Sequence, residues 1–223
     1  MPTIALLGGE SSGKTHLAHA LTAALTERGW PAVRVDEHLR DWCTQAGRAP
    51  RAEEQAGIAA EQTRRIDAAR RPGVVVVADT TALVVAAYSA HYFNDDSLWP
   101  AALDAQRRVD CTLLMGLDLP WQADGLFRES PAVRDAIDAR LRRALQEAGL
   151  AFQTIYGQGP RRLAAALAAL QPHLGSALVP DDERLRHGTG RWQCEACSDP
   201  GCEHRLFSAL LASRGSGLPT NEV

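Results

Sequence analysis

The fold of this chain is decided by the stretch Thr3-Ile4-Ala5-Leu6-Leu7-Gly8-Gly9-Glu10-Ser11-Ser12-Gly13-Lys14-Thr15. It opens with a short apolar run, which predicts a buried strand. The next residues match the pattern of glycine, four residues, glycine, lysine, and serine or threonine. Leucines and alanines at helical spacing then continue to Arg28. The stretch therefore predicts strand, tight loop and helix in succession, which is the context in which this pattern binds phosphate.

The residue types in this loop suit a bound nucleotide. Glycines let successive backbone amides point at one phosphate, and the start of the helix adds its positive dipole end. The chain has 24 lysine and arginine residues, and Lys14 is its only lysine. A compact ammonium can span two phosphates, which a planar guanidinium does poorly. We expect ATP to bind and the Thr15 hydroxyl to coordinate Mg²⁺. The predicted nucleotide-binding residues are Gly8, Gly9, Glu10, Ser11, Ser12, Gly13, Lys14 and Thr15.

The rest of the sequence alternates apolar runs with helical patterns. Further strands are predicted at 32–35, 74–78, 111–115 and 151–155, and helices at 52–71, 135–148 and 161–170, with an amphipathic stretch before residue 111. This alternation predicts an α/β fold, a doubly wound parallel sheet of about five strands with ligands at the carboxyl ends of the strands. Beyond residue 175 the pattern lapses. We therefore divide the chain into a P-loop domain at 1–175 and a tail at 176–223.

Composition narrows the class of protein. The 223 residues are 45% hydrophobic and 23% charged, which is typical of a globular protein. The net charge of −3 disfavours general nucleic-acid binding. No apolar run is long enough to span a membrane, and the N-terminus does not resemble a signal peptide. We expect a cytoplasmic protein whose partners are small molecules.

Carboxylates at predicted strand ends supply candidate catalytic groups. Asp79 ends the valine-rich strand and is placed to hold Mg²⁺, the alternative being a helix cap. Asp36 and Glu37 follow the second strand, and either could accept a proton from a hydroxyl. Asp36 could instead cap the next helix, so Glu37 is the preferred base. A segment from residue 120 through Arg128 is a candidate lid, and Arg128 or Arg134 could neutralise a moving phosphoryl group.

Missing motifs exclude other phosphate-loop proteins. A guanine-reading Asn-Lys-x-Asp would need a second lysine, so the familiar GTPases are excluded. Motor ATPases carry an acidic residue beside the strand-end aspartate, whereas Thr80 follows Asp79. A small-molecule kinase is therefore favoured. The alternative is a regulatory ATPase module whose tail binds a protein or nucleic-acid partner.

The chain resembles the ribosylnicotinamide kinase domain of NadR-like proteins and its AAA-like relatives. The matching pieces are the loop at 8–15, Asp36-Glu37-His38-Leu39-Arg40-Asp41-Trp42, Asp79-Thr80, and Pro120-Trp121 followed by Asp124-Gly125 and Arg128. They span about residues 3–170. The resemblance implies transfer of the ATP γ-phosphate to the 5′-hydroxyl of nicotinamide riboside, a step of NAD biosynthesis. Two residues, Leu126 and Phe127, separate Asp124-Gly125 from Arg128, whereas the relatives usually have one residue at this place.

The tail contains a cluster of metal-ligand residue types. Its members are Cys194, Cys197, Cys202 and His204. Two closely spaced pairs of soft or borderline ligands suit tetrahedral Zn²⁺, and four protein ligands would leave no open position. The sequence therefore predicts a structural zinc site at 194–204, the alternative being reduced cysteines without metal.

Overall fold

The computed structural model describes residues 1–123 and 130–175. They form a five-stranded sheet of order β2-β3-β1-β4-β5 in which every neighbouring pair is parallel. The strands are β1 (Thr3–Leu7), β2 (Ala32–Val35), β3 (Val75–Asp79), β4 (Cys111–Met115) and β5 (Gln153–Ile155). The helices are α1 (Lys14–Glu27), α2 (His38–Ala46), α3 (Ala52–Ala69), α4 (Ala82–Tyr92), α5 (Trp99–Gln106), α6 (Pro131–Glu147), α7 (Pro160–Ala169) and α8 (Gln171–Leu174). The predicted α/β fold with a five-stranded parallel sheet is confirmed.

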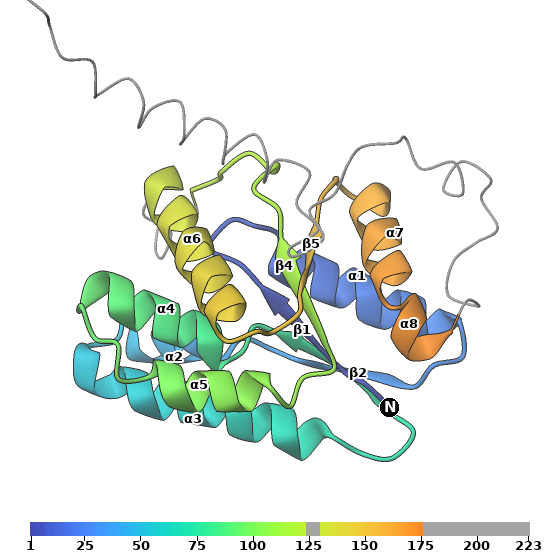
Figure 1. Cartoon of the computed structure of the whole chain (residues 1–223), viewed down its shortest axis with the longest axis horizontal. Coiled ribbons are helices and arrows are strands. Elements are labelled where there is room, and N and C mark those ends of the chain that lie inside the picture. Colours follow the sequence, from blue (N-terminus) through green and yellow to red (C-terminus); the bar gives the residue numbers. More distant parts are fainter. Residues whose placement is uncertain (124–129, 176–223) are drawn as a thin grey trace, which may run out of the picture. The chain divides into compact units, whose positions relative to one another are not determined.

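Helices cover both faces of the sheet. Figure 1 shows α1, α7 and α8 on one side and α3, α4, α5 and α6 on the other. Crossovers between parallel strands are right-handed, so the direction in which the chain moves along the sheet decides which face the connecting helix covers. The chain moves one way from β1 to β2 and the opposite way from β2 through β3 and β4 to β5, so its helices fall on two faces. Strands β1, β3 and β4 are buried along their whole length. Burial on both faces explains why β3 is a continuous run of apolar residues rather than an alternating one.

The strand order creates a crevice at the end of β1. The chain leaves β1 toward β2 and β3 on one side, and β4 and β5 lie on the other. Leu6 of β1 pairs with Asp79 at the end of β3, and Leu7 pairs with Leu114 of β4. The loop after β1 therefore lies at the point where the order reverses, which is where open α/β sheets bind ligands.

Helices α4 and α6 differ from the sequence prediction, and α2 and α8 were not predicted. The stretch predicted as amphipathic contains α4, most of which is buried because it packs against α3, α5 and α6. The helix predicted from residue 135 begins at Pro131. Its start is fixed by Ser130, whose hydroxyl accepts a hydrogen bond from the Val133 amide at 3.3 Å, and by a proline whose missing N–H costs nothing there.

Within the described residues, no helix has the length and hydropathy needed to cross a bilayer. The tail at 176–223 lies outside the described residues, so its division from the domain at 1–175 stays a prediction.

Candidate active site

The loop at 8–15 connects β1 to α1 and leaves the start of that helix open. Gly13 has φ +82° and precedes α1 without a side-chain cap. By contrast, α4 and α6 are capped by the hydroxyls of Thr81 and Ser130. The first amides of a helix have no intrahelical partner, and they carry the positive end of its dipole. Without a capping side chain, the start of α1 is free to bind an anion.

Lys14 is held inside this loop. Its side chain is buried, and its Nζ donates to the carbonyl oxygens of Gly8 and Gly9 at 2.8 and 2.9 Å. The Ser12 hydroxyl also donates to the Gly9 carbonyl, at 2.7 Å. These bonds fix the ammonium among the loop amides, so that its charge and theirs would act on the same phosphates.

Asp79 has the features of a metal-binding carboxylate. It is 1% exposed, and its Oδ1 has no hydrogen-bond partner among the described residues. The next residue, Thr80, has φ +81°, which is strained for a β-branched side chain and is the kind of outlier found at functional sites. The cap of α4 is Thr81 rather than Asp79, so the capping alternative does not apply.

The donor set fits Mg²⁺ supported by phosphate. The described residues contain no group of three or more histidine, cysteine, aspartate or glutamate side chains that could hold a metal alone. Magnesium, however, is commonly bound by one or two carboxylates together with substrate phosphates and water. The unpartnered oxygen of Asp79 and the hydroxyl of Thr15, which lines the adjacent pocket, match that pattern.

A pocket of about 850 Å³ opens from the loop. Its size is within the range of small-molecule sites. The loop and α1 form one wall, α2 and the start of α3 a second, and the end of α4 a third. The lining residues are Glu10, Ser11, Ser12, Gly13, Lys14, Thr15, His16, His19, Glu37, Leu39, Arg40, Cys43, Ala49, Pro50, Gln55, Tyr88, Tyr92 and Phe93.

The structure separates the two candidate bases. Glu37 lines the pocket, whereas Asp36 is half exposed and pairs with Arg34 at 2.5 Å outside it. Burial raises the pKa of Glu37; the Lys14 charge partly opposes this and the Asp79 charge adds to it. A carboxylate with a raised pKa, close enough to Lys14 and Asp79 to sense their charges, is suited to accept a proton at the site.

Aromatic rings form one side of the pocket. Tyr88 and Tyr92 of α4 are stacked, with ring centroids 6.1 Å apart and planes 7° from parallel. Burial raises the pKa of Tyr88, and the charges of Glu37 and Glu10 add to the effect, so its hydroxyl stays protonated. Trp42 of α2 instead packs against the guanidinium of Arg48, which lies 5.0 Å from its ring centroid, and is not among the residues that line the pocket.

The phosphate loop contacts the described part of the predicted lid. Trp121 Nε1 donates to Glu10 Oε1 at 3.2 Å, and the Gln122 amide donates to Ser11 Oγ at 2.8 Å. On the far side of the segment, the Ser130 amide donates to the same Glu10 oxygen at 3.1 Å. Glu10 therefore holds the chain before and after residues 124–129. Arg128 lies outside the described residues.

Arg134 packs against the loop rather than into the pocket. It is buried on α6, and its Nη1 donates to the Leu119 carbonyl at 2.8 Å. A Cβ placed on Gly9 would come within 2.9 Å of the Arg134 carbonyl oxygen. Only glycine therefore lets the loop and α6 approach so closely. The catalytic role predicted for Arg134 remains a prediction.

Sequence reasoning missed Arg162 at the start of α7. It is 4% exposed, and its Nη1 donates to the Ser12 carbonyl at 2.5 Å. Its Nη2 donates to Asp118 Oδ1 at 2.6 Å and to the Gly116 carbonyl at 3.2 Å. Burial lowers the pKa of Arg162, and the Asp118 charge opposes this effect. Arg162 thus ties the phosphate loop to the end of β4.

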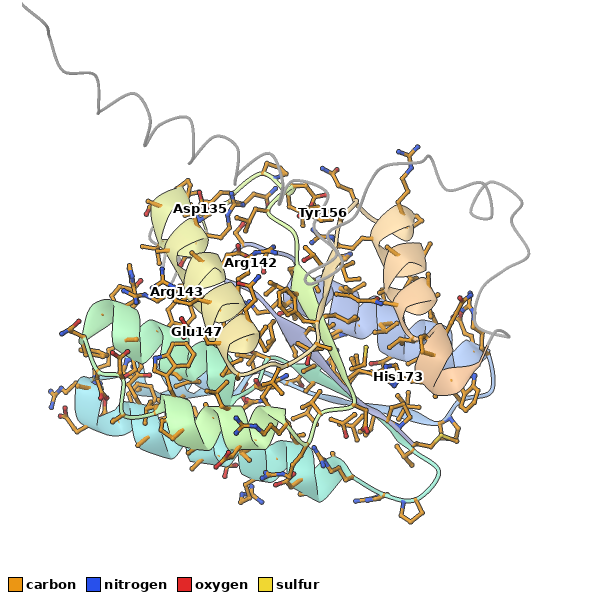
Figure 2. The ribbon with its side chains drawn as sticks, in the orientation of Figure 1. Asp135, Arg142, Arg143, Glu147, Tyr156 and His173 are labelled. Carbon is orange, nitrogen blue, oxygen red and sulfur yellow. The ribbon has the colours of Figure 1, made fainter. Side chains whose placement is uncertain are left out.

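The loop following β5 covers the end of β4 next to this arginine. The Gly157 amide donates to Asp118 Oδ2 at 2.6 Å, and a Cβ on Gly116 would overlap the ring of Tyr156. Figure 2 shows Tyr156 at the end of β5, beside the start of α7. The glycine at the end of β4 therefore makes room for the tyrosine, and the loops that follow β4 and β5 pack against each other.

Comparison with known proteins agrees with this geometry. A family described as "AAA domain" matches residues 3–162, well over half of the chain. The chain belongs to the AAA domain family. No curated protein matches it significantly in sequence.

Solved NadR structures share the fold of this AAA domain. A NadR protein in complex with NR superposes with a TM-score of 0.61 at 20% identity, covering 78% of this chain and 51% of the NadR chain. A NadR protein in complex with NAD and AMP-PNP gives the same TM-score and identity, covering 78% and 50%. The AAA domain chain thus spans about half the length of these NadR chains. The resemblance stated from sequence is confirmed at the level of family and fold.

The predicted zinc ligands belong to the tail. Cys194, Cys197, Cys202 and His204 lie outside the described residues. The zinc site stays a prediction.

Proposed function

We propose that this chain transfers the γ-phosphoryl group of ATP to the 5′-hydroxyl of a nucleoside, with nicotinamide riboside as the first acceptor to test. One observation carries the proposal: the phosphate loop and Glu37 line the same pocket, whose remaining walls could hold a second molecule. A nucleotide hydrolase needs room only for water beside the γ-phosphate. A cavity of about 850 Å³ that extends to α3 and α4 favours an organic acceptor.

Phosphate binding, metal binding and proton transfer each have a candidate residue in the described site. The loop amides and Lys14 bind the phosphates. Mg²⁺, held by Thr15 and Asp79, would supply charge neutralisation on the transferred group. Glu37 orients the 5′-hydroxyl and accepts its proton as the new oxygen–phosphorus bond forms and the bond to the leaving ADP breaks. Arg128 or Arg134 is proposed to stabilise the charge on the phosphoryl group.

Charge and aromatic surface support nicotinamide riboside among nucleosides. Its pyridinium ring carries a positive charge, which aromatic faces and carboxylates attract. The pocket offers the rings of Tyr88 and Tyr92 together with the carboxyl group of Glu37. A NadR protein that shares this fold has been solved in complex with NR.

The test is an ADP-release assay with Mg-ATP and a panel of nucleosides. We expect ADP release to require an acceptor, with nicotinamide riboside the best of the panel. Lys14→Met should abolish turnover while leaving the circular dichroism spectrum unchanged, because the hydrogen bonds of Lys14 Nζ within the described residues go to two carbonyls of the loop itself. Equal ADP release with and without nucleosides would instead identify a regulatory ATPase.

A further inference from the structure

Two glutamines on one face of α3 are buried, and only one of them is satisfied. Gln55 is 3% exposed and Gln62 is 1% exposed. Gln62 Oε1 accepts a hydrogen bond from the His38 amide at 2.7 Å, and its Nε2 donates to the Thr80 carbonyl at 3.4 Å. Gln55 Oε1 has no partner within residues 1–123 and 130–175. Gln55 therefore lacks a hydrogen bond to its side-chain oxygen, whereas Gln62, two turns further along the helix, has one.

Gln55 also belongs to the lining of the pocket. It lies in the first turns of α3, and Cys43, Ala49 and Pro50 add apolar surface to the same lining. Leaving a buried amide carbonyl without a hydrogen bond destabilises a folded protein. Such a cost is tolerated where the group serves a ligand. Among the described residues that line the pocket, Gln55 is the one with an uncharged side-chain amide.

We propose that Gln55 is a specificity-determining residue that hydrogen-bonds to the polar edge of the acceptor's ring. This inference rests on the proposed function. A glutamine amide offers one acceptor and a donor side by side, which a primary carboxamide matches reciprocally. The acceptor class is therefore a nucleoside whose planar ring carries a primary amide. In this arrangement Tyr88 and Tyr92 contact the face of the acceptor's ring, and Gln55 hydrogen-bonds to the carboxamide on that ring.

The experiment combines one change in the protein with one change in the acceptor. Gln55→Met keeps the side-chain volume and removes the amide. Steady-state kinetics are measured with nicotinamide riboside and with the ribosyl pyridinium that lacks the carboxamide. We expect Gln55→Met to raise the KM for nicotinamide riboside by about 10- to 100-fold, because a site built for a hydrogen bond loses it. The KM for the amide-free acceptor should change by less than about threefold, and the KM for ATP should not change.

Unfolding separates a ligand-binding role from a structural one. The urea midpoint of Gln55→Met should equal or exceed that of the wild type, because the variant removes an unsatisfied buried group. Gln62→Met is the matched control, and its midpoint should fall because it breaks two hydrogen bonds.

Two results would overturn the assignment of Gln55 while leaving the proposed function standing. One is an equal rise in KM for both acceptors in Gln55→Met. The other is a loss of stability in Gln55→Met that matches the loss in Gln62→Met. If the wild type neither binds nor phosphorylates either acceptor, the proposed function fails and the role of Gln55 fails with it.

Discussion

Replacing Arg162 by methionine should destabilise the domain and loosen the phosphate loop together. The variant keeps most of the aliphatic stem but removes the hydrogen bonds to Ser12, Gly116 and Asp118. Breaking a fully buried ion pair costs about 3–5 kcal/mol. The Asp118 side chain is 31% exposed and can regain water, so the lower end of that range applies. We therefore expect a loss of about 3 kcal/mol.

Urea unfolding followed by circular dichroism measures this loss. With an m-value of about 2 kcal/mol/M, the midpoint should fall by about 1.5 M. The KM for ATP should rise as well, because the released Ser12 carbonyl belongs to the loop that binds phosphate. Arg161→Met is the matched control, because Arg161 is next to Arg162 in sequence but its side chain is exposed. The urea midpoint of this variant should move by less than about 0.3 M. Equal midpoints for the two variants would refute the reasoning.

Two further predictions concern the base and the loop. Burial raises the pKa of Glu37, so the folded state binds its proton more tightly and the free energy of unfolding falls as pH rises above the ordinary value of 4.5. In urea titrations, Glu37→Gln should remove this part of the pH dependence of the unfolding free energy. The same variant should lower kcat about 10²- to 10⁴-fold. Identical pH dependence in the two proteins would contradict the raised pKa of Glu37. Gly9→Ala should reduce ATP binding in calorimetry because its Cβ meets the Arg134 carbonyl at 2.9 Å, whereas Gly57→Ala, in open space on α3, should stabilise the fold by about 0.5–1 kcal/mol. Unchanged ATP affinity in Gly9→Ala would show that the loop tolerates displacement.

The parts of the fold that sequence predicts are those governed by local pattern. The β-branched run ending at Asp79 and the apolar run ending at Leu7 need burial on both faces, so their strand character is visible without the structure. The phosphate loop can also be recognised from sequence, because the binding of phosphate requires its glycines and Lys14 at a fixed spacing. The burial of α4 is not visible, since Ala82–Tyr92 reads as apolar whether one face or the whole helix is covered.

The parts of the site that sequence misses depend on contacts between distant segments. Arg162 lies 150 residues from Ser12, and nothing in the sequence distinguishes it from the exposed Arg161. Gln55 and Gln62 are alike in sequence, and only their surroundings show that one is satisfied and the other is not. The sequence already favoured Glu37 over Asp36 as the base, and the structure adds that Glu37 lines the pocket whereas Asp36 does not.

The stoichiometry of the products tests the central claim most directly. The purified chain is incubated with Mg-ATP and nicotinamide riboside, and ADP, inorganic phosphate and nucleoside monophosphate are quantified by mass spectrometry and phosphorus NMR. The account predicts one nucleoside 5′-monophosphate for each ADP, with no inorganic phosphate above background. One inorganic phosphate for each ADP, with the nucleoside recovered unchanged, would contradict it.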